Sequence, residues 1–502
     1  MAADLPDRSL SLWLDKSGRP DHPPLDADDQ ADVAVVGAGI VGLTTAALLT
    51  RAGRRVIVLD RYDVGAVTTG HTTAKVTVLH GLRYAQIIRK HDVSTARAYA
   101  TANRTGLQWL VDEAREAGAD IEMRPAFTYV TEPRLEQAVR DEAAALRSAG
   151  VIAELTTETG LPFPVVAAVC VNDQAQFDPI PHVDRLAREV IDAGGAVHGQ
   201  TAVVSVRSGS PCHVTTAAGQ SVRADYVVLA TGMPFADRGL FFARVEPMRS
   251  YGIALPLEGP APEGMYLSVG RETRSVRTAA GPGGRPHLVV GGEGHKVGQG
   301  SPTLPRLKTL ATWAYEQFAV RAVTHRWSAQ DFRPVDLLPY IGPAWPGTER
   351  VLTATGFDKW GMTNGTAAGL ALAGSITGNP PTWSAALSSN RLNLLPSVGS
   401  IASANADVAV HLAAGWLRPD LSARPPAEGL GIVERRGIGK VARSCVDRTT
   451  HTVSARCTHL GGIVDWNDAE QSWDCPLHGS RFAPDGSVLE GPATRPLRPV
   501  EG

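Results

Sequence analysis

The chain has 502 residues, of which 43% are hydrophobic and 20% charged, and its 49 basic and 51 acidic residues leave a net charge of −2. This length predicts about three domains, and the ordinary composition excludes disordered and fibrous proteins. The near-zero charge gives no reason to expect a nucleic acid or an anionic membrane as a partner. We also expect no membrane-spanning helix and no secretory signal, and therefore a cytoplasmic protein.

Regular structure is predicted to begin after an irregular lead-in over residues 1–30, which is rich in Pro and Asp. A short apolar run at 32–36 predicts a buried strand, apolar spacing over 40–50 predicts a helix, and 55–59 predicts a second buried strand. This strand–helix–strand order is typical of the start of a nucleotide-binding fold.

The turn between the first strand and the helix carries Gly37, Gly39 and Gly42 in the spacing G-x-G-x-x-G. The three glycines allow a tight turn, close approach of the backbone to a pyrophosphate and close strand–helix packing. Asp60 ends the second strand, where a carboxylate accepts hydrogen bonds from a ribose. The motif does not distinguish NAD from FAD, whereas an acidic residue here disfavours NADP. A second such motif is absent.

Later segments continue the pattern. Helices are predicted around 183–191 and 307–318, and alternating residues over 213–232 predict antiparallel strands. Two Pro-rich tracts, 379–397 and 418–429, are interpreted as connectors that lead out of a large first domain. Short alternating runs in the last 75 or so residues predict a small all-β module.

Three segments occur in an order that resembles the D-amino-acid-oxidase-like FAD oxidoreductases: the glycine motif, Tyr226–Gly232 and Gly356–Gly365. The resemblance covers roughly residues 30 to 380. It implies bound FAD in an α/β (α+β) FAD-binding Rossmann-type domain with an interleaved antiparallel-sheet substrate domain. It also implies that a helix N-terminus after Gly356 points toward the flavin, where its dipole stabilises negative charge. The further cofactor-binding residues expected on this basis are Thr231, Gly232, Gly356, Gly361, Thr363 and Asn364.

Polar residues soon after Asp60 are the candidates for catalysis. The resemblance implies that the flavin's reactive face passes the segment containing His71 and Lys75. Some relatives attach the flavin covalently through a His in this region. We therefore expect His71 and Lys75 to orient the substrate or tune the flavin, although a solvated loop explains these residues equally well.

Two further pairs of residues have weaker support. Arg333 and Asp336 resemble a structural turn of the family, so we expect them to support the flavin domain rather than contact the substrate. Arg249 and Tyr251 fall in a predicted strand of the substrate domain, where they could face a substrate carboxylate.

A second centre is predicted near the C-terminus, where Cys457 and His459 form C-x-H and Cys475 and His478 form C-x-x-H. Two thiolates on one iron and two imidazoles on the other are the ligands of a Rieske [2Fe–2S] cluster. A structural zinc site is the competing interpretation, but zinc spacings normally pair C-x-x-C with H-x-x-x-H.

The flanking residues over about 428–502 resemble the Rieske family closely. In cytochrome-bc-type relatives, two further cysteines form a disulfide between the loops, and here those positions hold Gly462 and Leu477. Ser480 remains to hydrogen-bond the cluster, whereas Phe482 replaces a frequent Tyr. Loss of that donor predicts a potential toward the lower end of the span of about −150 to +300 mV.

The domain prediction combines both resemblances. It comprises the lead-in at 1–30, an oxidoreductase domain at 31–380, a linker at 381–427 and a Rieske domain at 428–502. Within the oxidoreductase domain, the flavin-binding parts are expected at about 31–80, 150–235 and 330–380, and the substrate parts at about 81–149 and 236–329.

The resulting hypothesis is an FAD-dependent enzyme that oxidises a C–N bond of an amine or amino-acid-like small molecule. Electrons would pass through the [2Fe–2S] cluster to an external acceptor, for which a partner protein is one candidate. One alternative is a reductase fed by NAD(P)H or a donor protein that serves an oxygenase. Another is an O₂-using oxidase in which the cluster has a structural or sensing role.

Overall fold

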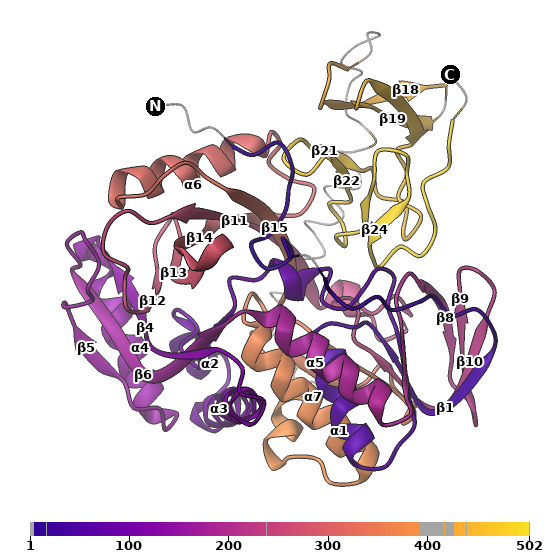
Figure 1. The fold of residues 1–502 in the computed structure, drawn as a ribbon, viewed down its shortest axis with the longest axis horizontal. Coiled ribbons are helices and arrows are strands. Elements are labelled where there is room, and N and C mark those ends of the chain that lie inside the picture. Colours follow the sequence, from indigo (N-terminus) through magenta and orange to yellow (C-terminus); the bar gives the residue numbers. More distant parts are fainter. Residues whose placement is uncertain are drawn as a thin grey trace.

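Two large sheets and a small β-rich domain organise the part of the chain that a computed structural model describes (Figure 1). The described residues are 5–16, 18–236, 238–391, 416, 426–437 and 439–500. The first domain combines an eight-stranded sheet with a nine-stranded one, and the C-terminal domain holds sheets of three and four strands. This arrangement confirms the predicted fold class.

The eight-stranded sheet has the order β16-β17-β10-β1-β2-β7, and its strands β17, β10, β1, β2 and β7 run parallel. Parallel strands are covered on both faces, which explains why β2 and the second half of β1 are continuously apolar and buried. The strands are β1 (Asp29–Val36), β2 (Val56–Leu59), β7 (Ala196–His198), β8 (Val203–Arg207), β9 (Cys212–Thr216), β10 (Ser221–Leu229), β16 (Tyr340–Pro343) and β17 (Val351–Thr355).

Small residues hold the two central helices together. In α7 (Gly361–Thr377), a Cβ on Gly365 would lie 3.0 Å from the Ile40 side chain, and one on Gly369 would lie 2.6 Å from Thr44. Ile40 and Thr44 belong to α1 (Ile40–Arg51), so α1 and α7 pack with little space between them. The other helices are α2 (Arg83–Lys90), α3 (Val93–Glu116), α4 (Glu136–Ser148), α5 (Pro179–Asp192) and α6 (Leu304–Gln317).

The nine-stranded sheet has the order β15-β11-β14-β13-β12-β4-β6-β3 and is antiparallel apart from the β4–β12 pair. Its strands are β3 (Lys75–Val76), β4 (Ile121–Val130), β5 (Glu154–Thr156), β6 (Ala167–Phe177), β11 (Val245–Pro256), β12 (Met265–Ser268), β13 (Arg274–Ala280), β14 (Pro286–Lys296) and β15 (His325–Pro334).

One segment differs from the predicted division of the first domain. The sequence assigned 150–235 to the flavin-binding part, but β5 and β6 lie in the nine-stranded sheet. The reason is pairing at long range, since β6 pairs with β4 from Ile121 opposite Phe177 to Val130 opposite Ala167. Such a register cannot be inferred from the local apolar pattern.

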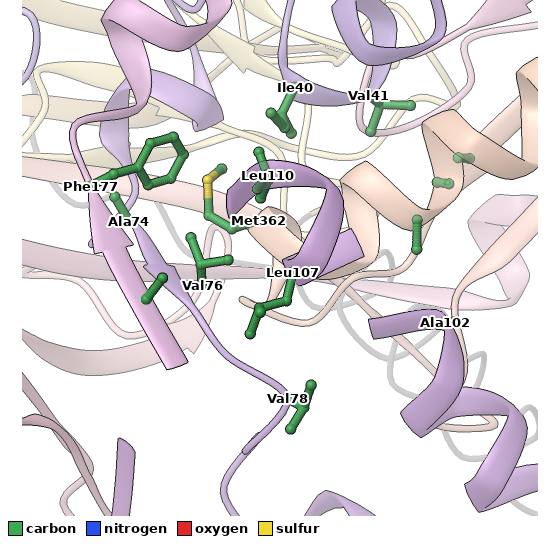
Figure 2. Close-up of a cluster of buried hydrophobic side chains, with 14 of the residues drawn as sticks. Ile40, Val41, Ala74, Val76, Val78, Ala102, Leu107, Leu110, Phe177 and Met362 are labelled. Atoms are coloured by element: carbon green, nitrogen blue, oxygen red, sulfur yellow. The ribbon is translucent and has the colours of Figure 1, made fainter. Parts of the chain in front are cut away.

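A shared core joins the sheets and helices of the first domain (Figure 2). Ile40 of α1, Val76 of β3, Leu107 and Leu110 of α3, and Met362 of α7 belong to one cluster of buried side chains. Residues from four elements far apart in sequence therefore belong to one core, which includes Ile40 at the start of α1. This packing fixes the position of the N-termini of α1 and α7 relative to each other.

The C-terminal domain contains β18 (Gly431–Arg436), β19 (Gly439–Val446) and β20 (Thr449–Ser454) in one sheet. A second sheet holds β21 (Asp465–Asn467), β22 (Ser472–Asp474), β23 (Arg481–Phe482) and β24 (Val488–Glu490). These are the short antiparallel strands that the sequence predicts. In Figure 1 this domain, coloured yellow, lies above the first domain.

The start of the predicted linker belongs to the first domain. A 3₁₀ helix, η5 (Thr382–Leu387), buries Trp383 and Leu387. Arg391 forms a buried ion pair with Asp336, with Nε 2.7 Å from Oδ2. Most of the remaining predicted linker lies outside the described residues.

Within the described residues, no helix is both long and apolar enough to cross a membrane.

Candidate functional site

The turn after β1 is built around glycine. Gly37 has φ of 108°, and a Cβ there would lie 2.5 Å from the carbonyl oxygen of Ala230. A Cβ on Gly42 would lie 1.9 Å from the carbonyl oxygen of Gly37. Gly39 is the N-cap of α1, and a Cβ there would meet only the side chain of Thr69. Backbone amides can approach a ligand here as a pyrophosphate requires, so these residues fit FAD.

A cavity of about 980 Å³ extends from this turn through the first domain. Many of the predicted site residues line it, although they come from separate segments. They are Gly37, Gly39, Asp60, His71, Lys75, Thr231, Gly232 and Gly361. The structure therefore brings most of the predicted cofactor-binding residues and both candidate catalytic residues to one space.

Asp60 follows β2 and joins the cavity wall to the glycine turn. Its Oδ2 accepts a hydrogen bond from the Ala38 amide at 2.7 Å, and its Oδ1 accepts one from the Tyr62 amide at 2.8 Å. Burial raises the pKa of the carboxyl group despite these bonds. Each carboxylate oxygen has a further lone pair, so Asp60 can still accept from a ribose hydroxyl.

The N-terminus of α7 reaches the cavity through Gly361 and Met362. Its positive end can stabilise negative charge on a ligand. Four other predicted cofactor residues do not line the cavity: Gly42, which packs against the Gly37 carbonyl, and Gly356, Thr363 and Asn364. Gly356 packs near Pro334, Thr363 donates a hydrogen bond to the Thr77 carbonyl, and the Asn364 amide contacts the Tyr99 hydroxyl. The side chains of Thr363 and Asn364 hold the start of α7 in place.

His71 and Lys75 both line the cavity, His71 from the 3₁₀ helix η1 (Thr68–His71) and Lys75 from β3. His71 Nδ1 donates to the Val67 carbonyl at 2.8 Å, and burial lowers the pKa of the ring. Lys75 Nζ donates to the Tyr266 carbonyl. Burial and the neighbouring Arg277 lower the pKa of the Lys75 amine well below its ordinary value. Both groups therefore favour their neutral forms.

The predicted cluster ligands lie on two loops of the C-terminal domain. Cys457 and Cys475 are both buried, and a hydrogen bond between their thiols lowers the pKa of Cys457 to about 7 and raises that of Cys475 well above its ordinary value. Such a pair of neighbouring thiols suits one ferric ion. The hydroxyl of Ser480 accepts from the Ala493 amide at 3.0 Å and lies next to Cys457.

The two predicted histidine ligands face each other across the same site, with ring centroids 5.1 Å apart. His478 Nε2 is buried and has no hydrogen-bond partner among the described residues, and burial lowers the pKa of the ring to about 3. A neutral imidazole with an unsatisfied nitrogen suits a metal ligand, so the donor set fits a Rieske cluster. Among the described residues, this site included, no group of three or more His, Cys, Asp or Glu side chains converges on a single metal position. A Rieske cluster needs only two protein ligands on each iron.

Gly462 and Leu477 occupy the positions that the resemblance gives to a disulfide. A Cβ on Gly462 would lie 2.7 Å from the Leu477 side chain and 3.1 Å from Cys475 Sγ. The two loops are therefore in direct contact without a covalent bridge. All five cysteines are free thiols.

Arg249 faces carboxylates of its own chain rather than those of a substrate. It is fully buried, with Nε 3.6 Å from Asp474 and Nη2 3.8 Å from Glu490. Both acids belong to the C-terminal domain, and Asp474 directly precedes Cys475. The expected contact with a substrate is wrong because the C-terminal domain covers this part of β11. Tyr251, the other residue of that pair, does line the cavity.

The C-terminal domain also supplies part of the cavity wall, which the sequence did not predict. The residues concerned are Leu489, Glu490, Gly491, Ala493 and Thr494. The hydroxyl of Tyr62, close to Asp60, donates to the Leu489 carbonyl at 2.9 Å. Nothing local in the sequence marks these residues, because their role depends on how the two domains pack.

Arg333 and Asp336, the remaining pair of predicted residues, have different surroundings in the structure. Asp336 pairs with Arg391 and supports the first domain, and Arg391 lowers the pKa of Asp336 against the opposing effect of burial. Arg333 lines the cavity, and its Nε lies 3.4 Å from Glu246.

Two family models match the chain. The model described as "FAD dependent oxidoreductase" matches residues 32–374, and the model described as "Rieske [2Fe-2S] domain" matches residues 433–501. The chain is 33% identical over 500 residues to the Rieske 2Fe-2S iron-sulfur protein YhfW of Bacillus subtilis (strain 168). That alignment spans 98% of this chain and 97% of the relative.

Solved structures share the fold of the first domain. Glycine oxidase from Geobacillus kaustophilus has a TM-score of 0.57 at 17% identity and covers 70% of this chain and 96% of its own. L-amino acid deaminase from Proteus vulgaris has a TM-score of 0.59 at 15% identity and covers 75% of this chain and 100% of its own. At these identities the likeness establishes a common fold.

Proposed function

Because the chain belongs to the FAD dependent oxidoreductase family and ends in a Rieske [2Fe-2S] domain, we propose that it oxidises a C–N bond of an amine or amino-acid-like substrate and sends the electrons through the cluster to an external acceptor. The cavity carries this proposal, because Gly39 and Gly361 of the first domain and Glu490 and Ala493 of the C-terminal domain line one space. Two structural neighbours, a glycine oxidase and an L-amino acid deaminase, support the substrate class.

The first domain would hold FAD through the glycine turn, Asp60 and the N-terminus of α7. Bound FAD supplies a two-electron acceptor that can release its electrons one at a time. The chain contributes orientation and charge. Backbone amides near Gly37 and Gly39 would stabilise phosphate oxygens, and the N-terminus of α7 would stabilise negative charge on the bound group.

His71 and Lys75 would handle the substrate's proton. An amine must lose its proton before its C–N bond can be oxidised, and a nearby neutral base can accept that proton. Lys75 fits this role because its amine lines the cavity and its pKa lies well below the ordinary value. His71 keeps Nε2 free to accept, because its Nδ1 donates to the Val67 carbonyl.

The external acceptor would meet the cluster on the side of His459 rather than on the side of His478. His478 is 4% exposed, whereas His459 is half-buried and its neighbour Leu460 is 51% exposed. Electrons would leave through the exposed face that holds His459. The buried face that holds His478 adjoins the first domain.

An anaerobic absorbance experiment tests the proposal. Amines, N-methyl amino acids, L- and D-amino acids, NADH and NADPH would each be added to the loaded protein. We expect an amine or amino acid to bleach the flavin band first and the cluster band next. Bleaching by NADH or NADPH alone would contradict the proposal and favour a reductase. Flavin bleaching that never reaches the cluster would favour an oxidase with a separate cluster.

A further inference from the structure

Gln330 of β15 forms a hydrogen bond between the first domain and a cluster loop. Its Nε2 donates to the carbonyl oxygen of Gly479 at 2.8 Å, and the residue is 3% exposed. Gly479 lies between His478, a predicted cluster ligand, and Ser480. The amide of Gln330 is therefore bonded to the backbone of the loop that carries a ligand.

The orientation of the Gln330 side chain is fixed by Arg249. Gln330 Oε1 accepts from Arg249 Nη2 at 2.9 Å, and Arg249 Nη1 donates to Ser328 Oγ at 2.6 Å. A guanidinium can only donate, so the amide oxygen must face Arg249 and the amide nitrogen must face Gly479. The carboxylates of Asp474 and Glu490 hold Arg249 from the other side.

The cluster loop fits closely onto the first domain at this position. Gly479 has φ of 79°, and a Cβ there would lie 2.6 Å from Pro247 and 2.7 Å from Gln330 Nε2. Only glycine allows this approach. The ring of His478 packs against Phe242 of the first domain, with centroids 5.3 Å apart. The buried cluster ligand is therefore in contact with the first domain.

Gln330 also reaches the FAD cavity. It lines the cavity of about 980 Å³, and its carbonyl oxygen accepts from Thr68 Oγ1 at 3.0 Å. Thr68 begins η1, the 3₁₀ helix that ends at His71. A second cavity of about 150 Å³ between the domains is lined by both Gln330 and His71. One residue thus contacts the wall of the flavin site and the cluster loop.

We propose that Gln330 is a positioning residue for internal electron transfer: its bond to Gly479 holds the His478 face of the cluster against the FAD cavity. This inference rests on the proposed function, in which electrons pass from one centre to the other. Complete reoxidation of the flavin would take two such transfers, each of which would move one electron to a ferric ion, which would become ferrous. The protons lost by the flavin would pass to water, and no bond between heavy atoms would change. A one-electron acceptor protein would reoxidise the cluster after each transfer.

Flash photoreduction of the loaded protein tests the role of Gln330. Light and a sacrificial donor reduce the flavin, and absorbance then follows the appearance of the reduced cluster. We expect Gln330→Leu to slow this step at least 10-fold. The variant should keep the cluster's EPR spectrum and potential, because Gln330 does not contact the predicted ligands. Hydrogen exchange of the 475–480 amides should rise, which gives a readout independent of turnover.

Two control variants separate positioning from general loosening. Ser328→Ala removes a neighbouring bond to Arg249 but leaves the Gly479 contact. Ser301→Ala removes a different bond between the domains, from Ser301 Oγ to the Trp466 carbonyl at 2.8 Å. Both should transfer electrons at the wild-type rate. If Gln330→Leu fails to fold, Gln330→Glu retains an acceptor for Arg249 and replaces the donor to Gly479 with a carboxylate oxygen, which cannot hydrogen-bond the Gly479 carbonyl.

A wild-type rate in the Gln330 variants would overturn the inference, and so would an equal loss of rate in Ser301→Ala. Photoreduction needs no amine. If no amine bleaches the flavin, the proposed function fails, and the role of Gln330 is still decided by the flash experiment.

Discussion

The glycine turn after β1 and the interface between the two domains both serve a cofactor site, but they are built in different ways. The turn is one contiguous segment, Gly37 to Gly42, whose shape follows from missing side chains. The interface joins Arg249 and Gln330 to Asp474 and Gly479, from segments more than 140 residues apart. The turn requires that no side chain fills the space taken by neighbouring backbone atoms. The interface requires that each buried polar or charged group has a partner.

This difference teaches where each region is vulnerable. Adding a methyl group should destroy the turn, because backbone atoms occupy the space a Cβ would need. The interface should fail when one polar partner is lost, because the others stay buried without compensation. Four substitutions test this contrast.

The largest expected effect is the loss of the cluster. Cys475→Ser should abolish the Rieske absorbance and EPR signals, because one iron loses a thiolate ligand. Flavin reduction by the substrate should stay within about twofold, whereas electron delivery to a one-electron acceptor should fall at least 100-fold. Cys445→Ser is the matched control, since Cys445 lies in β19 and bonds to Glu428. A cluster that survives in Cys475→Ser would contradict the ligand assignment.

Gly42→Ala tests the turn directly. The added Cβ would overlap the Gly37 carbonyl oxygen at 1.9 Å, so we expect a loss of about 4 kcal/mol in the free energy of unfolding and loss of bound FAD. Gly53→Ala, at the end of α1, meets no atom within 4 Å and has only an unfavourable φ of 77°. It should cost about 1 kcal/mol. Denaturant unfolding and flavin absorbance after gel filtration measure both, and equal losses would contradict the steric account.

Arg249→Met tests the interface. Removing the guanidinium leaves Asp474 and Glu490 with fewer partners in a buried region. We therefore expect the free energy of unfolding to fall by about 3 kcal/mol and hydrogen exchange in the 475–480 loop to become faster. Exchange in the glycine turn should not change. Arg55→Met breaks a half-exposed pair with Asp29 and should cost less than about 1 kcal/mol. Unchanged exchange in the loop of Arg249→Met would show that Arg249 does not hold the domains together.

The smallest expected effect is on the pH dependence of stability, and it comes from Asp331, which lines the cavity. Burial raises the pKa of Asp331 from 3.8 to about 7, although its carboxylate accepts from the amides of Phe332 and Lys359. The folded state therefore binds a proton that the unfolded state has released. Stability should fall as pH rises from about 4 to 7, by at most about 1.4 kcal/mol per pH unit.

Asp331→Asn should remove this contribution to the slope of unfolding free energy against pH. Urea unfolding of both proteins at several pH values between 4 and 8 measures it. The nearby charges of Asp358 and Lys359 remain in both proteins, so the difference between the two slopes isolates Asp331. Parallel slopes would contradict the raised pKa.

Local motifs made much of the molecule predictable. The glycines of the turn and the four predicted cluster ligands are short-range patterns, and the structure places the members of each set close together. The contribution of β6 to the second sheet and the position of Arg249 depend on pairing at long range. Thr363 and Asn364 belong to the correct helix, but helical geometry turns their side chains toward Thr77 and Tyr99 rather than the cavity. Residues 489–494 line the cavity only because of domain packing.

The central claim is that the FAD cavity and the Rieske cluster form one electron path within a single chain. The most direct test measures the rate of cluster reduction after anaerobic flavin reduction over a tenfold range of protein concentration. The buried contacts of His478 with Phe242 and of Gln330 with Gly479 predict a first-order rate that is independent of concentration. A rate that rises in proportion to concentration would show transfer between molecules and contradict the claim.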